Sequence, residues 1–348
     1  MLHKWPQHQV QFQHAPSAVP AQSVVIRFIF HALIIEADKH QCSTYHERVP
    51  NYYTDLPSRG ILDISGPAAR EFLQGQTTCD FEQLTATTPI SGAYCTPQGR
   101  VICDFRALQY QDQHYLLQTH AGICDEAAAV FGKYIIFSKA ELHNASDAWR
   151  QYGFWGDDIA SLLDVPGDRR SWREDDILWL QGDPGFEACV PTANVALFEE
   201  RLSTLLTRGT EAQWCSREIN AGIGHITPQT SGLFLPQMLN YQAVDRISFS
   251  KGCYTGQEVV ARLHYRGKTK RPMYLARLQP ALAEASPGDT LYRADSEQSV
   301  GTIVNIASDE DESRLLVSVA SKALPAGVHL GSPQGPTLEF LELPYSID

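Results

Sequence analysis

The strongest constraint on the fold is a short segment late in the chain, 251–258, with the sequence Lys-Gly-Cys-Tyr-Thr-Gly-Gln-Glu. Two glycines four residues apart, Gly252 and Gly256, frame a cysteine and a tyrosine, and glycines are suited to tight turns because they lack a Cβ atom. The residues after Gly256 repeat their apolar positions with helical spacing. The segment therefore predicts a turn that holds Cys253 beside the start of a helix.

Two interpretations of Cys253 follow from this placement. Free backbone N–H groups at a helix start carry partial positive charge, and Lys251 stands two residues before the sulfur. Both would favour the thiolate, which is the reactive form of cysteine. In the alternative interpretation, Cys253 is a small buried hydrophobic residue in a glycine turn, which is common because cysteine is among the most buried residue types.

Length and composition narrow the possible classes of protein. A chain of 348 residues is too long for one ordinary core, so two or three domains are expected. The formal net charge of −12 argues against extensive nucleic-acid binding, although the run 262–271 concentrates positive charge. Eight cysteines and twelve histidines show no metal-ligand or disulfide spacing. Reduced thiols in the cytoplasm and no protein-bound metal are therefore expected.

The first 46 residues form an N-terminal extension whose structure the sequence leaves open. Its apolar run, 24–35, is interrupted by Arg27 and His31 and is too short to span a bilayer, so no membrane association is expected. The run also lacks the cleavage site of a signal peptide. A strand or helix packed on the next domain and a loosely held extension are both compatible with it.

The remaining chain is predicted to contain two α+β units followed by a β unit. Residues 47–268 mix strand and helix patterns, with a boundary between the two units near residue 144. After this region, 269–346 contains short strands separated by proline, glycine and acidic turns, which predicts a small β-barrel or sandwich. The clearest strands are predicted at 60–64, 90–95, 101–108, 149–155, 177–181, 273–278, 300–306 and 315–319, and the clearest helices at 125–137 and 194–207.

Four segments together resemble the signature of the YgfZ folate-binding proteins, which are relatives of the glycine cleavage T protein, an aminomethyltransferase. They are 251–258 with its continuation to Arg271, and the segments 72–78, 92–100 and 234–240. The resemblance covers residues 55–346 and leaves the N-terminal extension outside. It implies an α+β fold like that of the glycine cleavage T protein: two interleaved α+β domains and a C-terminal β-barrel, arranged as a ring around a folate pocket.

The resemblance also implies a function. It points to a tetrahydrofolate-binding accessory protein for the assembly or repair of iron–sulfur enzymes, including radical enzymes that modify tRNA. Cys253 would be the functional thiol, as nucleophile, transient metal ligand or redox partner, and Lys251 would set its ionisation. The expected partners are folate, iron–sulfur client enzymes and, through the run 262–271, a weakly bound tRNA. The protein is expected to be a cytoplasmic monomer.

Two other functions remain open. An enzyme of the aminomethyltransferase class, with folate-dependent one-carbon transfer, would use an aspartate pair after a glycine-rich turn. Here the matching place reads Cys103-Asp104, so only the second acid is kept, and Asp104 would be its acid–base group. The transferases lack the cysteine signature, which favours the YgfZ branch. In a third hypothesis, the ring is a scaffold that recruits a cluster donor, and folate is only structural.

The resemblance assigns several residues to the folate site, Asp104 among them. Glu187 matches the glutamate that holds the pterin ring, a task suited to a carboxylate because the pterin amidine edge offers two parallel donors. The alternative is an exposed, solvated glutamate. Tyr254 would stack on the pterin or pack in a core, and Gln257 is placed with the folate contacts. Arg262, with Arg266, would bind the glutamate tail or belong to a solvated basic face.

Overall fold

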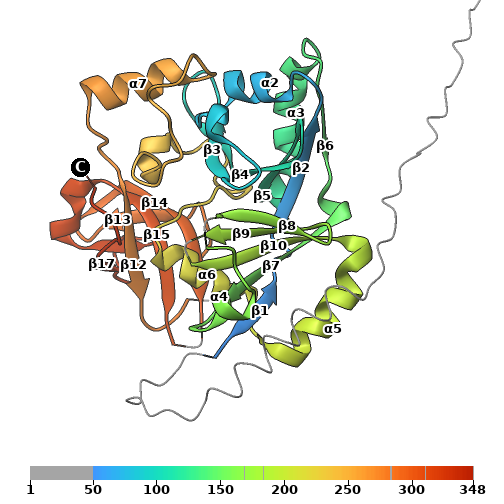
Figure 1. The fold of residues 1–348 in the computed structure, drawn as a ribbon. Helices are drawn as coiled ribbons and strands as arrows, with labels where there is room; N and C mark the ends of the chain where they lie inside the picture. The colour runs from blue at the N-terminus through green and yellow to red at the C-terminus, as the bar shows by residue number, and fades with distance from the viewer. Residues whose placement is uncertain (1–49, 168, 183, 283, 310, 348) are drawn as a thin grey trace, which may run out of the picture.

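The computed structural model describes residues 50–167, 169–182, 184–282, 284–309 and 311–347. The N-terminal extension expected at 1–46, with its apolar run, lies outside these residues. The described part of the chain forms three β-sheets with helices around them (Figure 1). None of its helices is long and apolar enough to cross a membrane.

The first sheet has five strands in the order β3-β4-β5-β2-β6, and all its pairs are antiparallel. Along β2 the side chains alternate, so that Leu62 and Ile64 face the helices while Ile61 faces the second sheet. The strands are β2 (Arg59–Ser65), β3 (Ile90–Cys95), β4 (Val101–Gln111), β5 (His114–His120) and β6 (Glu141–Asn144), and the helices packed beside them are α2 (Ala69–Gln76) and α3 (Cys124–Ile135).

The second sheet has six strands in the order β11-β1-β7-β10-β9-β8. Helix α5 (Val195–Leu205) covers one face with Phe198 and Leu202, which are its buried residues. The strands are β1 (Tyr52–Asp55), β7 (Trp149–Trp155), β8 (Ser171–Glu174), β9 (Ile177–Gly182), β10 (Gly185–Pro191) and β11 (Thr207–Arg208), and a short helix, α4 (Ile159–Leu162), follows β7.

The chain crosses between these two sheets, which makes the expected α+β units interleaved. Strand β1 pairs with β7 and β11 in the second sheet, whereas the next strand, β2, pairs with β5 and β6 in the first. The facing sides of the two sheets share one apolar cluster, to which Ile61 and Leu116 contribute from the first sheet and Trp149 and Leu180 from the second. The two sheets therefore pack as layers of one body.

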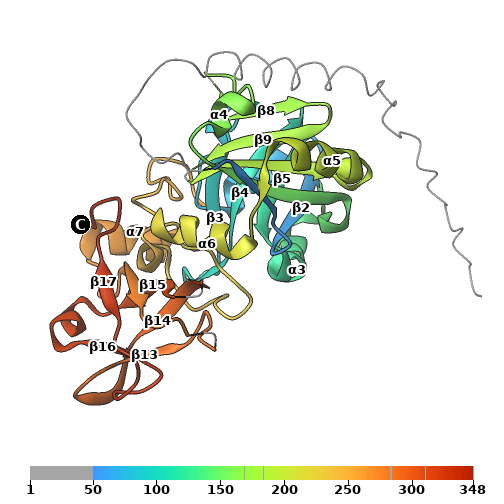
Figure 2. The ribbon, with the colours of Figure 1, turned by 90° about the horizontal axis from the view of Figure 1, so that it is seen from below.

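The third sheet is the curled C-terminal β unit, a half-barrel that stands beside the other two sheets (Figure 2). Its order is β16-β13-β14-β15-β12-β17. Helix α6 (Glu211–Asn220) connects it to the rest by packing against β14 and β15. The strands are β12 (Met273–Leu278), β13 (Thr290–Arg293), β14 (Ser296–Ser308), β15 (Ser313–Val319), β16 (Val328–Leu330) and β17 (Glu339–Leu341).

Between α6 and the third sheet, the chain returns to the first sheet and forms α7 (Gln257–Arg266). Figure 1 shows α7, α2 and α3 along the same end of the molecule. The predicted helix after Gly256 is confirmed, and Gly256 is its N-cap with a φ of 87°. Short 3₁₀ turns complete the described structure: η1 (Phe81–Gln83), η2 (Ala121–Ile123), η3 (Ser146–Ala148), η4 (Thr192–Asn194), η5 (Pro236–Leu239) and η6 (Ser321–Ala326).

Candidate functional site

Cys253 lies at the surface of the protein, in the loop that precedes α7. The interpretation of Cys253 as a small buried hydrophobic residue is therefore wrong. The other six described cysteines are buried or half-buried. Burial raises the pKa of such thiols, to about 11 for Cys79 and about 12 for Cys95, so they are protonated at neutral pH.

Lys251 fastens this loop to α2. Its Nζ atom donates hydrogen bonds to the backbone carbonyls of Gln74 at 2.6 Å, Thr77 at 2.8 Å and Cys79 at 2.6 Å. These carbonyls lie at the C-terminal end of α2 and just beyond it, where carbonyl groups lose their helical partners. An ammonium group has three donors, so all the donors of Lys251 are engaged. An effect of Lys251 on Cys253 would therefore act through its charge.

Burial lowers the pKa of Lys251 to about 8, although the neighbouring Cys79 and Asp80 oppose the shift. A pKa of about 8 still leaves the ammonium mostly charged at neutral pH. Its Nζ atom also lies 5.3 Å from the centre of the Tyr254 ring, a distance at which a cation and an aromatic face attract each other.

Tyr254 is buried, which favours packing over an open stacking platform. Its hydroxyl has no hydrogen-bond partner among the described residues, and burial raises its pKa. The next residue, Thr255, donates a hydrogen bond to the side chain of Gln76 at 3.0 Å, so the loop contacts α2 a second time. Gln257 is half-buried at the first position of α7.

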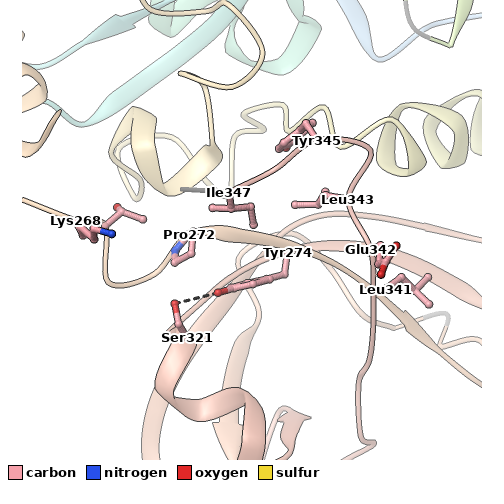
Figure 3. Close-up of a pocket in the computed structure, with 10 residues that line it drawn as sticks. Lys268, Pro272, Tyr274, Ser321, Leu341, Glu342, Leu343, Tyr345 and Ile347 are labelled. Carbon is pink, nitrogen blue, oxygen red and sulfur yellow. Dashed lines mark hydrogen bonds between the residues drawn. The ribbon is translucent and has the colours of Figure 1, made fainter.

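The basic run after Gln257 is exposed to solvent. Arg262 and Arg266 are one helical turn apart on α7, and both are exposed, as are Lys268, Lys270 and Arg271. Lys268 borders a hollow of about 540 Å³ between the segment after α7 and the C-terminal tail (Figure 3). The other residues labelled there are Pro272, Tyr274, Ser321, Leu341, Glu342, Leu343, Tyr345 and Ile347, and Thr269 also lines the hollow.

Glu187 is buried in the layer between the first two sheets, so its interpretation as an exposed, solvated glutamate is wrong. It lies on β10, and its Oε1 atom is 2.5 Å from the guanidinium of Arg106 on β4. Gln118 on β5 donates a hydrogen bond to the other carboxylate oxygen at 2.7 Å. A carboxylate oxygen has two acceptor lone pairs, so both oxygens can accept a further hydrogen bond.

Asp104 is held by a second buried cluster at the junction with the third sheet. One carboxylate oxygen contacts Arg246 and, at 2.8 Å, Nδ1 of His225, while the other accepts a hydrogen bond from the backbone of Ile226 at 2.7 Å. His225 in turn exchanges backbone hydrogen bonds with the side chain of Asn305 on β14. Burial alone would raise the pKa of Asp104, but the charges of His225 and Arg246 outweigh it and hold this pKa well below its usual range.

Sequence reasoning missed the partners that complete these clusters. Glu218 on α6 binds Arg59 at 2.6 Å and faces Nε2 of His225 at 3.4 Å. These residues are far apart in the sequence and have no motif around them. No local signal marks them: Glu218, for example, stands next to Arg217 on a helix with several polar residues. Among the described residues, His, Cys, Asp and Glu side chains form no group that could hold a metal ion.

A family model and curated relatives both match this chain. Residues 35–193 match the family described as GCVT N-terminal domain. A tRNA-modifying protein YgfZ from Aliivibrio fischeri is 30% identical over 87% of this chain and 95% of its own length. A second one, from Colwellia psychrerythraea, is 33% identical over 64% of this chain and 70% of its own length.

The fold also has a relative among solved structures. The glycine cleavage system aminomethyltransferase T from Bartonella henselae superposes with a TM-score of 0.66. The superposition covers 86% of this chain and 87% of that structure, at 16% sequence identity. This likeness shows the α+β fold of the glycine cleavage T protein, which confirms the expected fold class.

Proposed function

Because this chain belongs to the YgfZ family, we propose that it is a tetrahydrofolate-binding accessory protein for the assembly or repair of iron–sulfur enzymes, including radical enzymes that modify tRNA. It would act as a monomer in the cytoplasm, with Cys253 as its functional thiol. The observation that carries the proposal is the position of Cys253: an exposed thiol at the start of α7, in a loop that Lys251 holds against α2.

Exposure matters because a thiol that acts on another protein must reach beyond its own surface. Of the seven described cysteines, Cys253 alone is exposed. The loop is also held in place by contacts with Gln74 and Gln76 of α2, which Lys251 and Thr255 make on either side of Cys253.

The residues around Glu187 fit a bound pterin in their donor and acceptor chemistry. Tetrahydrofolate, when bound, would supply a carrier of one-carbon units and a reducing pterin ring. The carboxylate of Glu187 would accept hydrogen bonds from the pterin, while Arg106 and Gln118 hold it in orientation. Asp104, Tyr254, Gln257 and Arg262 are the further residues that we assign to this site from the family resemblance.

The fold is compatible with the aminomethyltransferase alternative, but the environment of Asp104 does not suit an acid–base group. A general acid or base works best with a pKa near the operating pH. The pKa of Asp104 is held far below neutral pH by His225 and Arg246. Its carboxylate also already accepts hydrogen bonds from three protein donors. Formation of methylene-tetrahydrofolate from an aminomethyl-lipoyl protein would nevertheless establish this alternative.

The main test is the replacement Cys253→Ala in cells that contain no other copy of the protein. We expect thiolated tRNA to fall to the level of cells without the protein, whereas the purified variant keeps its fold and its tetrahydrofolate affinity. Cys215→Ala is the matched control because Cys215 is a half-buried thiol on α6. Normal thiolated tRNA in the Cys253→Ala cells would contradict the proposal. A cluster donor that binds equally well to Cys253→Ser would favour the scaffold hypothesis.

The folate site has its own test. Glu187→Gln keeps the shape of the side chain but removes its charge, and a hydrogen bond to a charged group contributes about 1.5–3 kcal/mol. Tetrahydrofolate binding, measured by calorimetry, should therefore weaken by about tenfold or more. Glu258→Gln is the control, since Glu258 is exposed on α7. Unchanged affinity in Glu187→Gln, with a normal melting temperature, would remove Glu187 from the site.

A further inference from the structure

Beside the thiol loop, a hollow of about 530 Å³ lies between α2 and the end of α3. Its walls include Phe72 and Gln76 from α2, Tyr134 from the last turn of α3, and Phe137, which follows the end of α3 by two residues. Three large apolar side chains project into solvent here: Tyr134 is 40% exposed, Ile136 72% and Phe137 86%. Apolar groups gathered on a surface in this way are typical of a protein interaction site.

The hollow is linked through Gln76 to the loop that carries Cys253. Gln76 lines the hollow and accepts the hydrogen bond from Thr255, two residues after Cys253. The backbone carbonyl of Gln74, next to Gly75 in the lining, accepts a hydrogen bond from Lys251, two residues before Cys253. The loop therefore contacts the wall of the hollow, and α7 begins directly after the loop. Figure 1 shows α3, α2 and α7 along the same end of the molecule.

Positive charge at this end is concentrated on α7, where Arg262 and Arg266 are exposed, although the whole chain has a net charge of −12. Lys133 and Lys139 flank the exposed apolar side chains. The exposed acidic residues on these helices are Glu71 on α2, Asp125 and Glu126 in the first turn of α3, and Glu258 on α7. A partner with complementary charge is therefore acidic, and one that fills the hollow presents an apolar side chain.

We propose that this surface, formed by Gln76, Tyr134, Ile136, Phe137, Cys253 and Arg266 and called here the docking face, binds the client enzyme. An apolar side chain of the client enters the hollow, acidic residues of the client lie along α7, and the part of the client to be repaired lies between them over Cys253. This rests on the proposed function, which it extends by naming the contact surface and the chemistry of the partner.

A protein fits this surface better than RNA does. Ile136 is aliphatic and gives a base no stacking plane, and Glu71 in the wall of the hollow would repel a phosphate, whereas the aromatic rings of Tyr134 and Phe137 suit either partner. An RNA would be attracted to the basic run alone and would leave the hollow empty. Only a partner with both an apolar side chain and acidic residues would fill the hollow and also contact the basic residues of α7.

Photo-crosslinking tests the contact directly. A benzophenone amino acid placed at Phe137 of the full-length protein in cells should crosslink to an iron–sulfur enzyme, identified by mass spectrometry. The same group at Leu197, an apolar residue of α5 that is 43% exposed, should not. With Ile136→Asp added, the crosslink should decrease about tenfold. A crosslink from position 137 only to RNA or to a second copy of this chain, or none at all, would overturn the proposal.

A cellular assay separates this proposal from the proposed function. Phe137→Asp should lower thiolated tRNA and leave tetrahydrofolate affinity unchanged, whereas Leu197→Asp should change neither. If Cys253→Ala is defective and Phe137→Asp is normal, the docking face is wrong and the thiol function stands. If position 137 crosslinks to an iron–sulfur enzyme and Cys253→Ala is normal, the docking face stands and the thiol function is wrong.

Discussion

The carbonyl groups at the end of α2 explain why a lysine stands at position 251. Three carbonyls converge on one point, and a primary ammonium has three donors for them. Arginine is planar and longer, and methionine has no donor, so neither would satisfy the three acceptors in the same way. In the sequence, Lys251 was interpreted only by its distance from Cys253. Its partners were not visible there because they are backbone atoms more than 170 residues away.

The lowered pKa of Lys251 predicts a pH dependence of stability. The folded protein releases the proton of Lys251 near pH 8, whereas the unfolded chain releases it near 10.5. Between these values the unfolded state binds more protons, so the contribution of this group to stability increases as pH rises through that window. The difference in unfolding free energy between wild type and Lys251→Met should therefore grow from pH 8 to 10.5. Parallel curves in urea denaturation across this range would contradict the shift.

At the scale of an element, the start of α7 depends on one of the two motif glycines. Gly256 has a φ of 87°, and a Cβ atom there would lie 2.5 Å from the carbonyl oxygen of Thr96 in the β3–β4 turn. At Gly252 an added Cβ atom would meet nothing within 4 Å. Both glycines looked equivalent in the sequence, but only Gly256 lets the hairpin turn and α7 approach each other.

These two glycines form a matched pair for mutation. Gly256→Ala should lower the unfolding free energy by at least about 2 kcal/mol, because a strained backbone conformation costs about 1–3 kcal/mol and the contact with Thr96 adds to it. Gly252→Ala should change stability by less than about 1 kcal/mol. Chemical denaturation measures both. Equal effects of the two substitutions would show that the turn is not what fixes the start of α7.

The same scale explains which elements could be predicted. Strands β2 to β4 and the helices α3 and α5 have clear alternation or helical spacing, and the sequence predicts them. The two-to-four-residue strands β1, β11 and β16 are too short to show a period, so they were missed. Helix α6 starts at Glu211, where Thr210 and Gln213 form a capping box.

At the scale of the whole molecule, the buried cluster at Asp104 joins parts of the chain that are remote in sequence. Asp104 lies on the first sheet, His225 and Arg246 on the irregular segment before α7, and His225 is fixed to the third sheet by Asn305. A buried charge that loses its partner is strongly unfavourable. The cluster therefore acts as a junction whose loss should affect the entire fold.

This junction gives a prediction with an internal control. Asp104→Asn should destabilise the protein by about 3–5 kcal/mol, because it leaves the buried guanidinium of Arg246 without its counter-charge. Asp55→Asn removes an exposed pair with Arg208, so it should cost less than about 1 kcal/mol. Guanidinium denaturation of both variants makes the comparison. Similar small effects would mean that the buried cluster contributes little.

The Asp104 cluster should also make the unfolding free energy fall at low pH. The folded pKa of Asp104 lies below its ordinary value of 3.8, so its contribution to stability is complete above that value and is lost as the pH falls toward the folded pKa. The stability difference between wild type and Asp104→Asn should therefore shrink below pH 3.8. A difference that stays constant down to pH 2 would show that Asp104 is not shifted.

The sequence by itself determined the family, the α+β fold and the turn that carries Cys253, because long motifs and regular periods are local properties of the chain. Only the tertiary structure decided which residues are exposed and which meet. It brought Lys251 to carbonyls at the end of α2, buried Glu187 against Arg106, and placed the apolar residues after α3 in one hollow with Gln76, which contacts the thiol loop. These contacts join segments far apart in sequence, and no local pattern records them.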